Sequence, residues 1–170
     1  KALALGVNRI LFQSIEVSIT AKSINTLYQH LTPNTLVVGA KMHKEHGVIS
    51  GIQKLEGWIT PWNTLALWNL EKLAITGFLP LSGGNLHSLP GGVEEVSVIT
   101  LLQKLYPHQM DAKIVEIEEL HWEVEWRCEN RTLYHAQKMA SKNERAAAHI
   151  HFLGIDSGEV IVINKEKSNG

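Results

Sequence analysis

The sequence lacks cysteine pairs, and it lacks an excess of charge of either sign. Cys128 is the only cysteine among 170 residues, so an internal disulfide and a zinc site built on cysteines are both excluded. A lone thiol favours a reducing compartment. The 16 basic and 17 acidic residues leave a formal net charge of −1, which gives no broad basic field for nucleic acid or for an anionic membrane.

Long apolar runs and targeting signals are also missing. No run reaches the roughly 18 to 20 apolar residues that a membrane span needs, and Lys1-Ala2-Leu3 lacks the basic and then apolar order of a signal peptide. We therefore expect a cytoplasmic protein with no transmembrane segment, while association with a membrane surface stays open. Because the chain begins with Lys and not Met, we also expect a processed or partial form of a longer chain.

Familiar phosphate and metal motifs are absent as well. The closest stretch to a phosphate loop, Gly83-Gly84-Asn85, follows no predicted strand and opens no clear helix. The nine histidines include no HExxH pair, and His149 and His151 face different ways on a helix. The sequence shows no internal repeat and no low-complexity segment. Any chemistry must therefore come from residues that are scattered along the chain.

What is present is a composition with 44% hydrophobic residues, which is typical of one globular domain with a core of its own. We predict a single α/β domain over residues 1–163 and a polar tail over 164–170. A buried strand at 9–13, a helix begun by Ser18 or Thr20, and a continuous apolar run at 35–40 form a strand–helix–strand unit. This order predicts a mixed, mostly parallel sheet with flanking helices.

The other expected elements follow from periodicity and from cap residues. They are the end of a helix at 1–7, a surface excursion at 43–57, a strand or helix at 64–68, a short helix after Asn69, a loop at 78–92, a helix at 94–106, strands at 113–117, 121–127 and 160–163, and a long helix at 132–153 that ends at Gly154.

Four polar residues stand at strand ends or helix starts, where α/β sheets place their ligands: Glu16, Glu94, Glu95 and His121. An acidic residue with a histidine is able to hold a divalent cation beside a diphosphate, and a separate carboxylate is able to act as a general base. A purely structural interpretation stands beside this one, because carboxylates in the first turn of a helix are favoured by its dipole.

Aromatic residues concentrate in one polar stretch, which contains Trp58, Trp62 and Trp68. Tryptophan faces are good platforms for sugar rings, because they combine apolar area with a polar edge. The alternative is that these side chains are the hydrophobic anchors of a surface excursion, or part of an interface between subunits.

The order of these features resembles the C-terminal part of an inverting glycosyltransferase of the GT-A fold, similar to glycosyltransferase family 2. The resemblance spans residues 1–155 and lies in RILFQSIEVSITAKSINTLYQHLTPNTLVVGAKM, NTLALWNLEKLAITGF, GGVEEVSVITLLQKL and KIVEIEELHW. It implies a nucleotide-diphospho-sugar transferase fold. The family's N-terminal half, which cradles the nucleotide, has no counterpart here, so we expect that part to be lacking from this chain.

The resemblance also implies roles for individual residues. Ser14-Ile15-Glu16 stands in the place of the acidic DXD turn that binds the sugar nucleotide, with Ser14 where the family has its first aspartate. Glu16 and His121 would hold Mn²⁺ or Mg²⁺. Glu95 would be the catalytic base and Glu94 its support. The acceptor side would be lined by Trp62, Asn63 and Trp68.

Three functions are consistent with the sequence. The first is a metal-assisted, inverting transfer of a sugar from a nucleotide-diphosphate donor to a carbohydrate or another hydroxyl acceptor. The second is a non-catalytic domain of the same fold that acts as a binding or assembly module. The third is an unrelated small α/β enzyme that uses one of the Glu and His pairs. The partners expected for the first are the donor and the acceptor, with no nucleic acid and with an oligomer left open.

Overall fold

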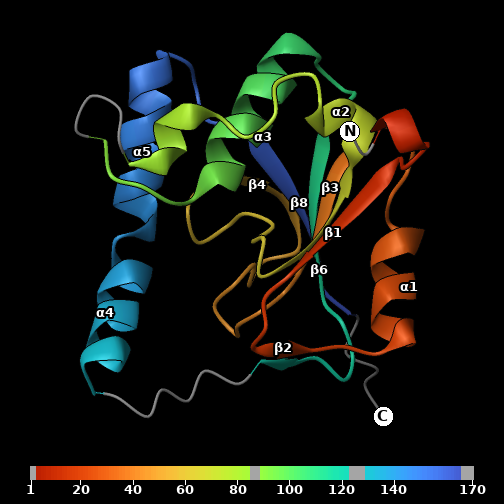
Figure 1. The fold of residues 1–170 in the computed structure, drawn as a ribbon, viewed down its shortest axis with the longest axis horizontal. Helices are drawn as coiled ribbons and strands as arrows, with labels where there is room; N and C mark the ends of the chain where they lie inside the picture. Colours follow the sequence, from red (N-terminus) through yellow and green to blue (C-terminus); the bar gives the residue numbers. More distant parts are fainter. Residues whose placement is uncertain (1–2, 85–88, 123–128, 166–170) are drawn as a thin grey trace.

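The chain forms an α/β structure with a mixed sheet of six strands, which a computed structural model describes over residues 3–84, 89–122 and 129–165 (Figure 1). A second, two-stranded sheet pairs β2 (Val17–Ser18) with β7 (His121–Trp122). The strand order of the main sheet is β1 (Arg9–Gln13), β5 (Leu65–Asn69), β3 (Thr35–Ala40), β6 (Asp111–Val115), β8 (Glu159–Ile163) and β4 (Gly51–Lys54).

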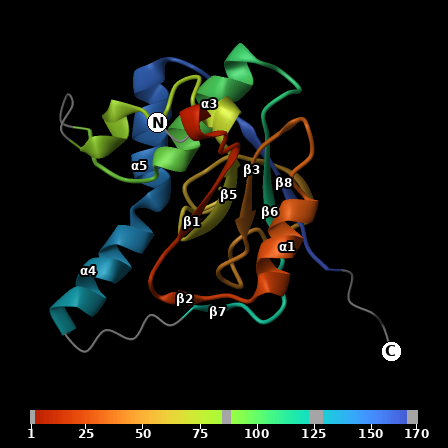
Figure 2. The same cartoon turned by 45° about the vertical axis from the view of Figure 1, so that its right-hand side comes forward.

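Helices cover both faces of the main sheet (Figures 1 and 2). The described helices are the short 3-10 helices η1 (Leu3–Leu5) and η2 (Pro80–Gly83), and the α-helices α1 (Ala21–Gln29), α2 (Leu70–Leu73), α3 (Glu94–Leu105), α4 (Glu129–Ala140) and α5 (Lys142–Leu153). No helix among the described residues is long and apolar enough to cross a membrane.

The hydrophobic core is divided by the sheet into two parts. Along β5, Ala66 and Trp68 join the part that contains α3 and α5, whereas Leu65 and Leu67 join the part that contains α1. Successive side chains of a strand point to opposite faces, so a strand that is apolar throughout must be covered on both sides. The same holds for β3, all of whose residues are buried, as the sequence predicted.

The predicted mostly parallel sheet is confirmed in that most of the strands run in one direction. It is wrong in that most neighbouring strands are antiparallel to each other. In the described sheet β1, β3, β6 and β8 run one way, and β5 and β4 run the other way. Only the pairings β3–β6 and β6–β8 are parallel, because β5 lies between β1 and β3. The strand–helix–strand unit therefore does not place its own two strands side by side.

Several local predictions are confirmed by side-chain caps. Thr20 caps α1 and forms a capping box with Ser23. The Asn69 side chain accepts hydrogen bonds from the first backbone N–H groups of α2. Gly154 ends α5 in a left-handed conformation that suits glycine. These caps act within a few residues, which is why the sequence alone was able to locate them.

Other local predictions are wrong or only partly described. The single helix expected at 132–153 is two helices that meet at Ser141, whose hydroxyl bonds back to the carbonyl of Gln137. The excursion at 43–57 contains β4, because its apolar partner strand β8 supplies the pairing. Residues 1–7 hold only η1 in their described part. The strand expected at 121–127 is described at His121–Trp122, and its remainder lies outside the described residues.

The predicted site lies at the end of the sheet where most strands have their carboxyl ends, which we call the carboxyl edge. The strands β1, β3 and β6 end there, and β5 begins there because it runs in the opposite direction. Ser14 directly follows β1, and Asn63 shortly precedes β5. Ligands of α/β sheets bind outside the carboxyl ends of the strands, so this edge is the expected position for a functional site.

Candidate functional site

A cavity of about 280 Å³ lies at this edge, between the end of β1, the start of α3 and the junction of α4 with α5. It brings together residues that the sequence singled out from distant segments: Ser14, Trp62, Asn63, Glu94 and Glu95. It also contains basic residues of α4 and α5 that the sequence did not single out: Lys138, Lys142 and Arg145. Opposite charges therefore border one small space.

The loop before α3 holds Glu94 and Glu95 in place through an unusual backbone. Gly92 has φ of 93°, and Val93, which precedes the helix, has φ of 53°. A β-branched residue in this left-handed region is rare and costs free energy, and such strain gathers at functional sites. The loop keeps this conformation because α5 holds it from outside. The Arg145 guanidinium donates to the Gly91 carbonyl at 2.8 Å, and the His149 imidazole donates to the Pro90 carbonyl at 2.7 Å.

Glu95 is buried in the wall of the cavity, with 6% of its surface exposed. Its Oε1 accepts a hydrogen bond of 2.6 Å from the backbone N–H of Asn63. Burial, followed by the neighbouring Glu94 carboxylate, raises the pKa of Glu95 to about 7. A carboxyl group of this kind exchanges its proton near neutral pH, which is the property that a general base needs.

Asn63 connects the two carboxylates to the core. Its side-chain amide donates to Glu94 Oε1 at 3.1 Å, and its own amide oxygen accepts from the indole N–H of Trp68 at 2.9 Å. Trp68 is fully buried and packs edge-on against Phe78. The expectation that Trp68 offers its face to an acceptor sugar therefore does not fit this structure, in which the ring lies inside the core and orients Asn63.

Trp62 is also buried, and it lies between two nitrogen-containing groups. His46 stacks on it with ring centroids 4.0 Å apart, and Lys142 Nζ lies 3.2 Å from the centroid of the indole. At these distances the two groups occupy opposite faces of the ring. His46 accepts from the Met42 N–H and donates to the Thr60 carbonyl, and burial lowers its pKa to about 3, so His46 is neutral.

Lys142 is the main residue that sequence reasoning missed. It is partly buried, and burial lowers its pKa to about 7, against the opposing attraction of Glu95. A signal for it was present in the sequence, since Lys138, Lys142, Arg145 and His149 follow the spacing of one helical face. That signal needed the position of α5 against the loop before α3 to become informative.

Of the predicted metal ligands, Glu16 lies in the turn directly before β2 and His121 lies in β7. The Ser14 hydroxyl donates to the Glu16 carboxylate, and this hydrogen bond is the main cause of the lowered pKa of Glu16. His121 is exposed and pairs across the β2–β7 ribbon with Ser18, two positions beyond Glu16. Over residues 3–84, 89–122 and 129–165, no three His, Cys, Asp or Glu side chains gather into a metal site.

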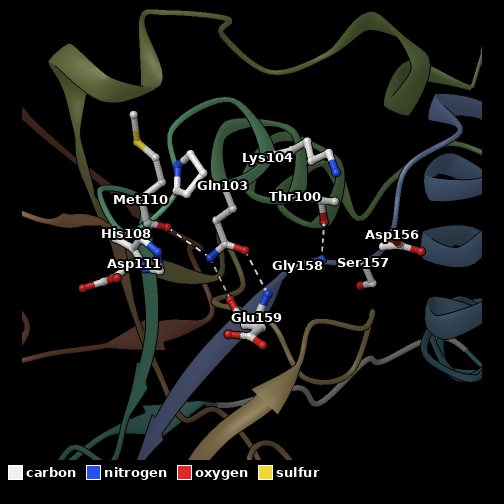
Figure 3. A pocket seen from close by; sticks show the side chains of 11 residues that line it. Thr100, Gln103, Lys104, His108, Met110, Asp111, Asp156, Ser157, Gly158 and Glu159 are labelled. Carbon is white, nitrogen blue, oxygen red and sulfur yellow. Dashed lines mark hydrogen bonds between the residues drawn. The ribbon is translucent and has the colours of Figure 1, made fainter.

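A second cavity, of about 330 Å³, lies at the opposite edge of the sheet, where β6 and β8 begin (Figure 3). Its central side chain, Gln103, donates to the carbonyls of Met110 and Glu159 and accepts from the Glu159 N–H. Thr100 accepts from the Gly158 N–H. These hydrogen bonds join α3 to the starts of β6 and β8. The polar side chains at the centre of this cavity therefore hold elements of the fold together, and we do not take it as the candidate site.

Comparisons with known proteins add no family to this picture. No family model, no curated protein and no solved structure matches the chain.

Proposed function

We propose that the protein is an inverting glycosyltransferase that moves a sugar from a nucleotide-diphosphate donor to an acceptor hydroxyl, with Glu95 as the general base. The observation that carries the proposal is the buried Glu95 carboxyl group, held by the Asn63 N–H in the wall of a cavity at the carboxyl edge of the sheet. The same residue stands where the resemblance assigns the base. The position of Glu95 and its raised pKa both support its role as the general base.

In the proposed reaction the acceptor oxygen attacks the anomeric carbon of the donor sugar. Its proton passes to the Glu95 carboxylate, and the bond between the sugar and the diphosphate breaks, with both electrons leaving on the diphosphate. Attack from the side opposite the leaving group inverts the anomeric configuration. A base whose pKa is near the working pH has a useful deprotonated fraction and still accepts the proton readily.

Glu94 has a supporting role in this proposal. Its carboxylate raises the pKa of Glu95 through repulsion of like charges, and it accepts from the Asn63 side chain whose backbone holds Glu95. Glu94 thereby fixes both the proton affinity and the position of the base. Misplacement of a reacting group by about 1 Å is able to cost on the order of 100-fold in rate.

The proposal includes Mn²⁺ or Mg²⁺, for which the chain offers Glu16 and His121. Such ions are commonly bound through one or two carboxylates together with substrate phosphates and water. Glu16 lies in the turn directly before β2, and His121 pairs with Ser18 two positions further along, so both residues belong to the same part of the fold. They would be two of the ligands, and the donor diphosphate and water would supply the others. A bound ion would supply positive charge to the leaving diphosphate.

A second candidate is a non-catalytic module of the same fold. It is favoured by Ser14, which stands where the family has an aspartate and whose hydroxyl is bound to Glu16. Such a turn has one carboxylate fewer for a metal, and a domain without turnover would tolerate this loss.

The deciding experiment uses the full-length protein with Mn²⁺ and a panel of sugar nucleotides. Donor hydrolysis or transfer supports the enzyme, provided that Glu95→Gln abolishes turnover and still binds the donor. Full activity in Glu95→Gln would exclude Glu95 as the base. A protein with neither turnover nor metal-dependent nucleotide binding would reject the glycosyltransferase.

A further inference from the structure

The cavity that contains Glu95 has a basic wall as well as an acidic one. Lys138 comes from α4, and Lys142 and Arg145 come from α5, while Glu94 and Glu95 lie across from them at the start of α3. The proposed reaction assigns work to the acidic wall and leaves the basic wall without a role. The hydrogen bonds of these cations decide which of them is available to a ligand.

Each of the three guanidinium nitrogens of Arg145 donates a hydrogen bond within the protein. Its Nη1 donates to the Gly91 carbonyl, its Nη2 to the Lys138 carbonyl at 2.6 Å, and its Nε to the Ser141 hydroxyl at 3.2 Å. A Cβ atom at Gly92 would collide with this guanidinium, so the contact leaves no spare space. Arg145 is therefore a positioning residue that holds the loop before α3.

Lys142 is in the opposite situation. Its backbone is fixed, because a Cβ atom at Gly57 would collide with the Lys142 carbonyl, and the next residue, Asn143, bonds to the Trp58 N–H and to Glu56. Its amino group lies over Trp62 at the cavity. In the described parts of the chain it forms no hydrogen bond, and the ion pairs there join other lysines, Lys22 and Lys165, to Glu118.

The ammonium group of Lys142 is only partly buried, and within the described residues its nitrogen is not one of the fully buried polar atoms that lack a partner, so it is open to the cavity. Removal from water is costly for a charge unless hydrogen-bond acceptors replace the water, and an aromatic face replaces only part of it. Glu94 and Glu95 attract this group electrostatically, but within the described residues neither carboxylate lies close enough to Lys142 to form a salt bridge. An oxyanion that enters the cavity would supply the missing acceptors.

We propose that Lys142 binds an oxyanion of a substrate, a phosphate or a carboxylate, in the cavity between α3 and α5. This inference rests on the proposed function and names a substrate class for the same site. The oxyanion belongs either to the diphosphate of the donor or to an anionic group on the acceptor. In both cases it lies beside Glu95, so binding at Lys142 holds the reacting hydroxyl or the leaving group next to the base.

Calorimetric binding tests the proposal with defined probes. Pyrophosphate and UDP stand for the donor, and glucose 6-phosphate, with glucose as its neutral reference, stands for an anionic acceptor. We expect Lys142→Met to weaken binding of at least one anionic probe by 10-fold or more, and Lys142→Arg to keep most of it. The control Lys104→Met changes an exposed lysine at the opposite edge and should leave binding unchanged.

The pattern of loss identifies the source of the oxyanion. Loss confined to pyrophosphate and UDP assigns Lys142 to the donor, and loss confined to glucose 6-phosphate assigns it to the acceptor. Equal affinities of the native protein and Lys142→Met for all three anions would overturn the proposal, as would the absence of any anion binding by the native protein. Thermal unfolding of both Lys142 variants checks that they are folded.

The two proposals fail in different ways. Anion binding that depends on Lys142 in a protein without sugar transfer would reject the glycosyltransferase and keep the oxyanion site. Sugar transfer with unchanged kcat and KM in Lys142→Met would keep the glycosyltransferase and reject the oxyanion site.

Discussion

The two edges of the sheet treat buried polar groups in opposite ways. At the edge where β6 and β8 begin, Gln103 and Thr100 have their hydrogen bonds met by the backbone of neighbouring elements. At the carboxyl edge, the buried Glu95 and the partly buried Lys142 face one cavity without pairing with each other. Satisfied polar groups stabilise a fold, whereas charges held apart in a cavity cost stability and indicate a function.

The largest effect should come from Glu95→Gln, which keeps the side-chain shape and the oxygen that accepts from Asn63. Removal of a general base typically lowers the rate by about 10²- to 10⁴-fold. We expect a loss of kcat in this range with donor affinity retained, measured by steady-state kinetics and calorimetry. The matched variant Glu94→Gln should lose less of kcat. The pH at which its rate begins to increase should be lower than in the native protein, because Glu94 raises the pKa of the base.

Gln103→Leu tests the opposite edge. The change removes three hydrogen bonds and leaves backbone groups of Met110 and Glu159 without their partner. We expect the free energy of unfolding to fall by about 3 kcal/mol in urea denaturation, with kcat/KM unchanged. The control Gln29→Leu alters an exposed glutamine of α1 and should change stability by less than about 0.5 kcal/mol. A large loss of activity in Gln103→Leu would break the contrast between the edges.

The pH dependence of stability should separate the two charged residues of the carboxyl edge. The pKa of Glu95 is raised from 4.5 to about 7, so the folded state binds this proton more tightly than the unfolded chain. The resulting contribution to the free energy of unfolding is fully present below pH 4.5 and is lost as pH rises to about 7. Relative to Glu95→Gln, the native protein should lose stability over this window, by at most about 1.4 kcal/mol per pH unit. Urea titrations at a series of pH values measure the difference.

Lys142 should change the free energy of unfolding at higher pH than Glu95 does, and in the opposite direction. Its pKa is lowered from 10.5 to about 7, so the unfolded chain binds more protons between these values and stability rises with pH there. Lys142→Met should remove that rise. Parallel pH profiles of the native protein and both variants would show that neither group is titrating as its burial requires.

The smallest effect on kcat should come from Trp68→Phe, which keeps a ring beside Phe78 and removes the N–H that holds Asn63. The lost hydrogen bond and the space that the smaller ring leaves in the core together cost on the order of 2 to 3 kcal/mol of stability. We expect kcat to fall by less than 10-fold, because Asn63 is still attached to both carboxylates. The control Trp58→Phe removes an indole that lies edge-on to Trp62, and it should leave kcat unchanged. Equal kcat values in Trp68→Phe and Trp58→Phe would show that the hydrogen bond from Trp68 to Asn63 does not affect catalysis.

Part of the site was predictable because its residues stand at local boundaries. Glu94 and Glu95 open a helix after a glycine pair, and Ser14 follows an apolar strand, so the sequence located both. Lys142 was not predictable, because its importance comes from contacts with Trp62 and with the loop at 57–58. The glycosyltransferase resemblance, the metal ligands and the role of Glu95 stay predictions.

The sequence by itself determined the class of the fold and most of its local elements. Apolar periodicity and the caps at Thr20, Asn69 and Gly154 act over a few residues, so they are readable without neighbours. Only the tertiary structure decided that β5 separates β1 from β3 and that α5 lies against the loop before α3. Both depend on hydrogen bonds and burial between segments far apart in the chain, and local patterns do not specify such partners.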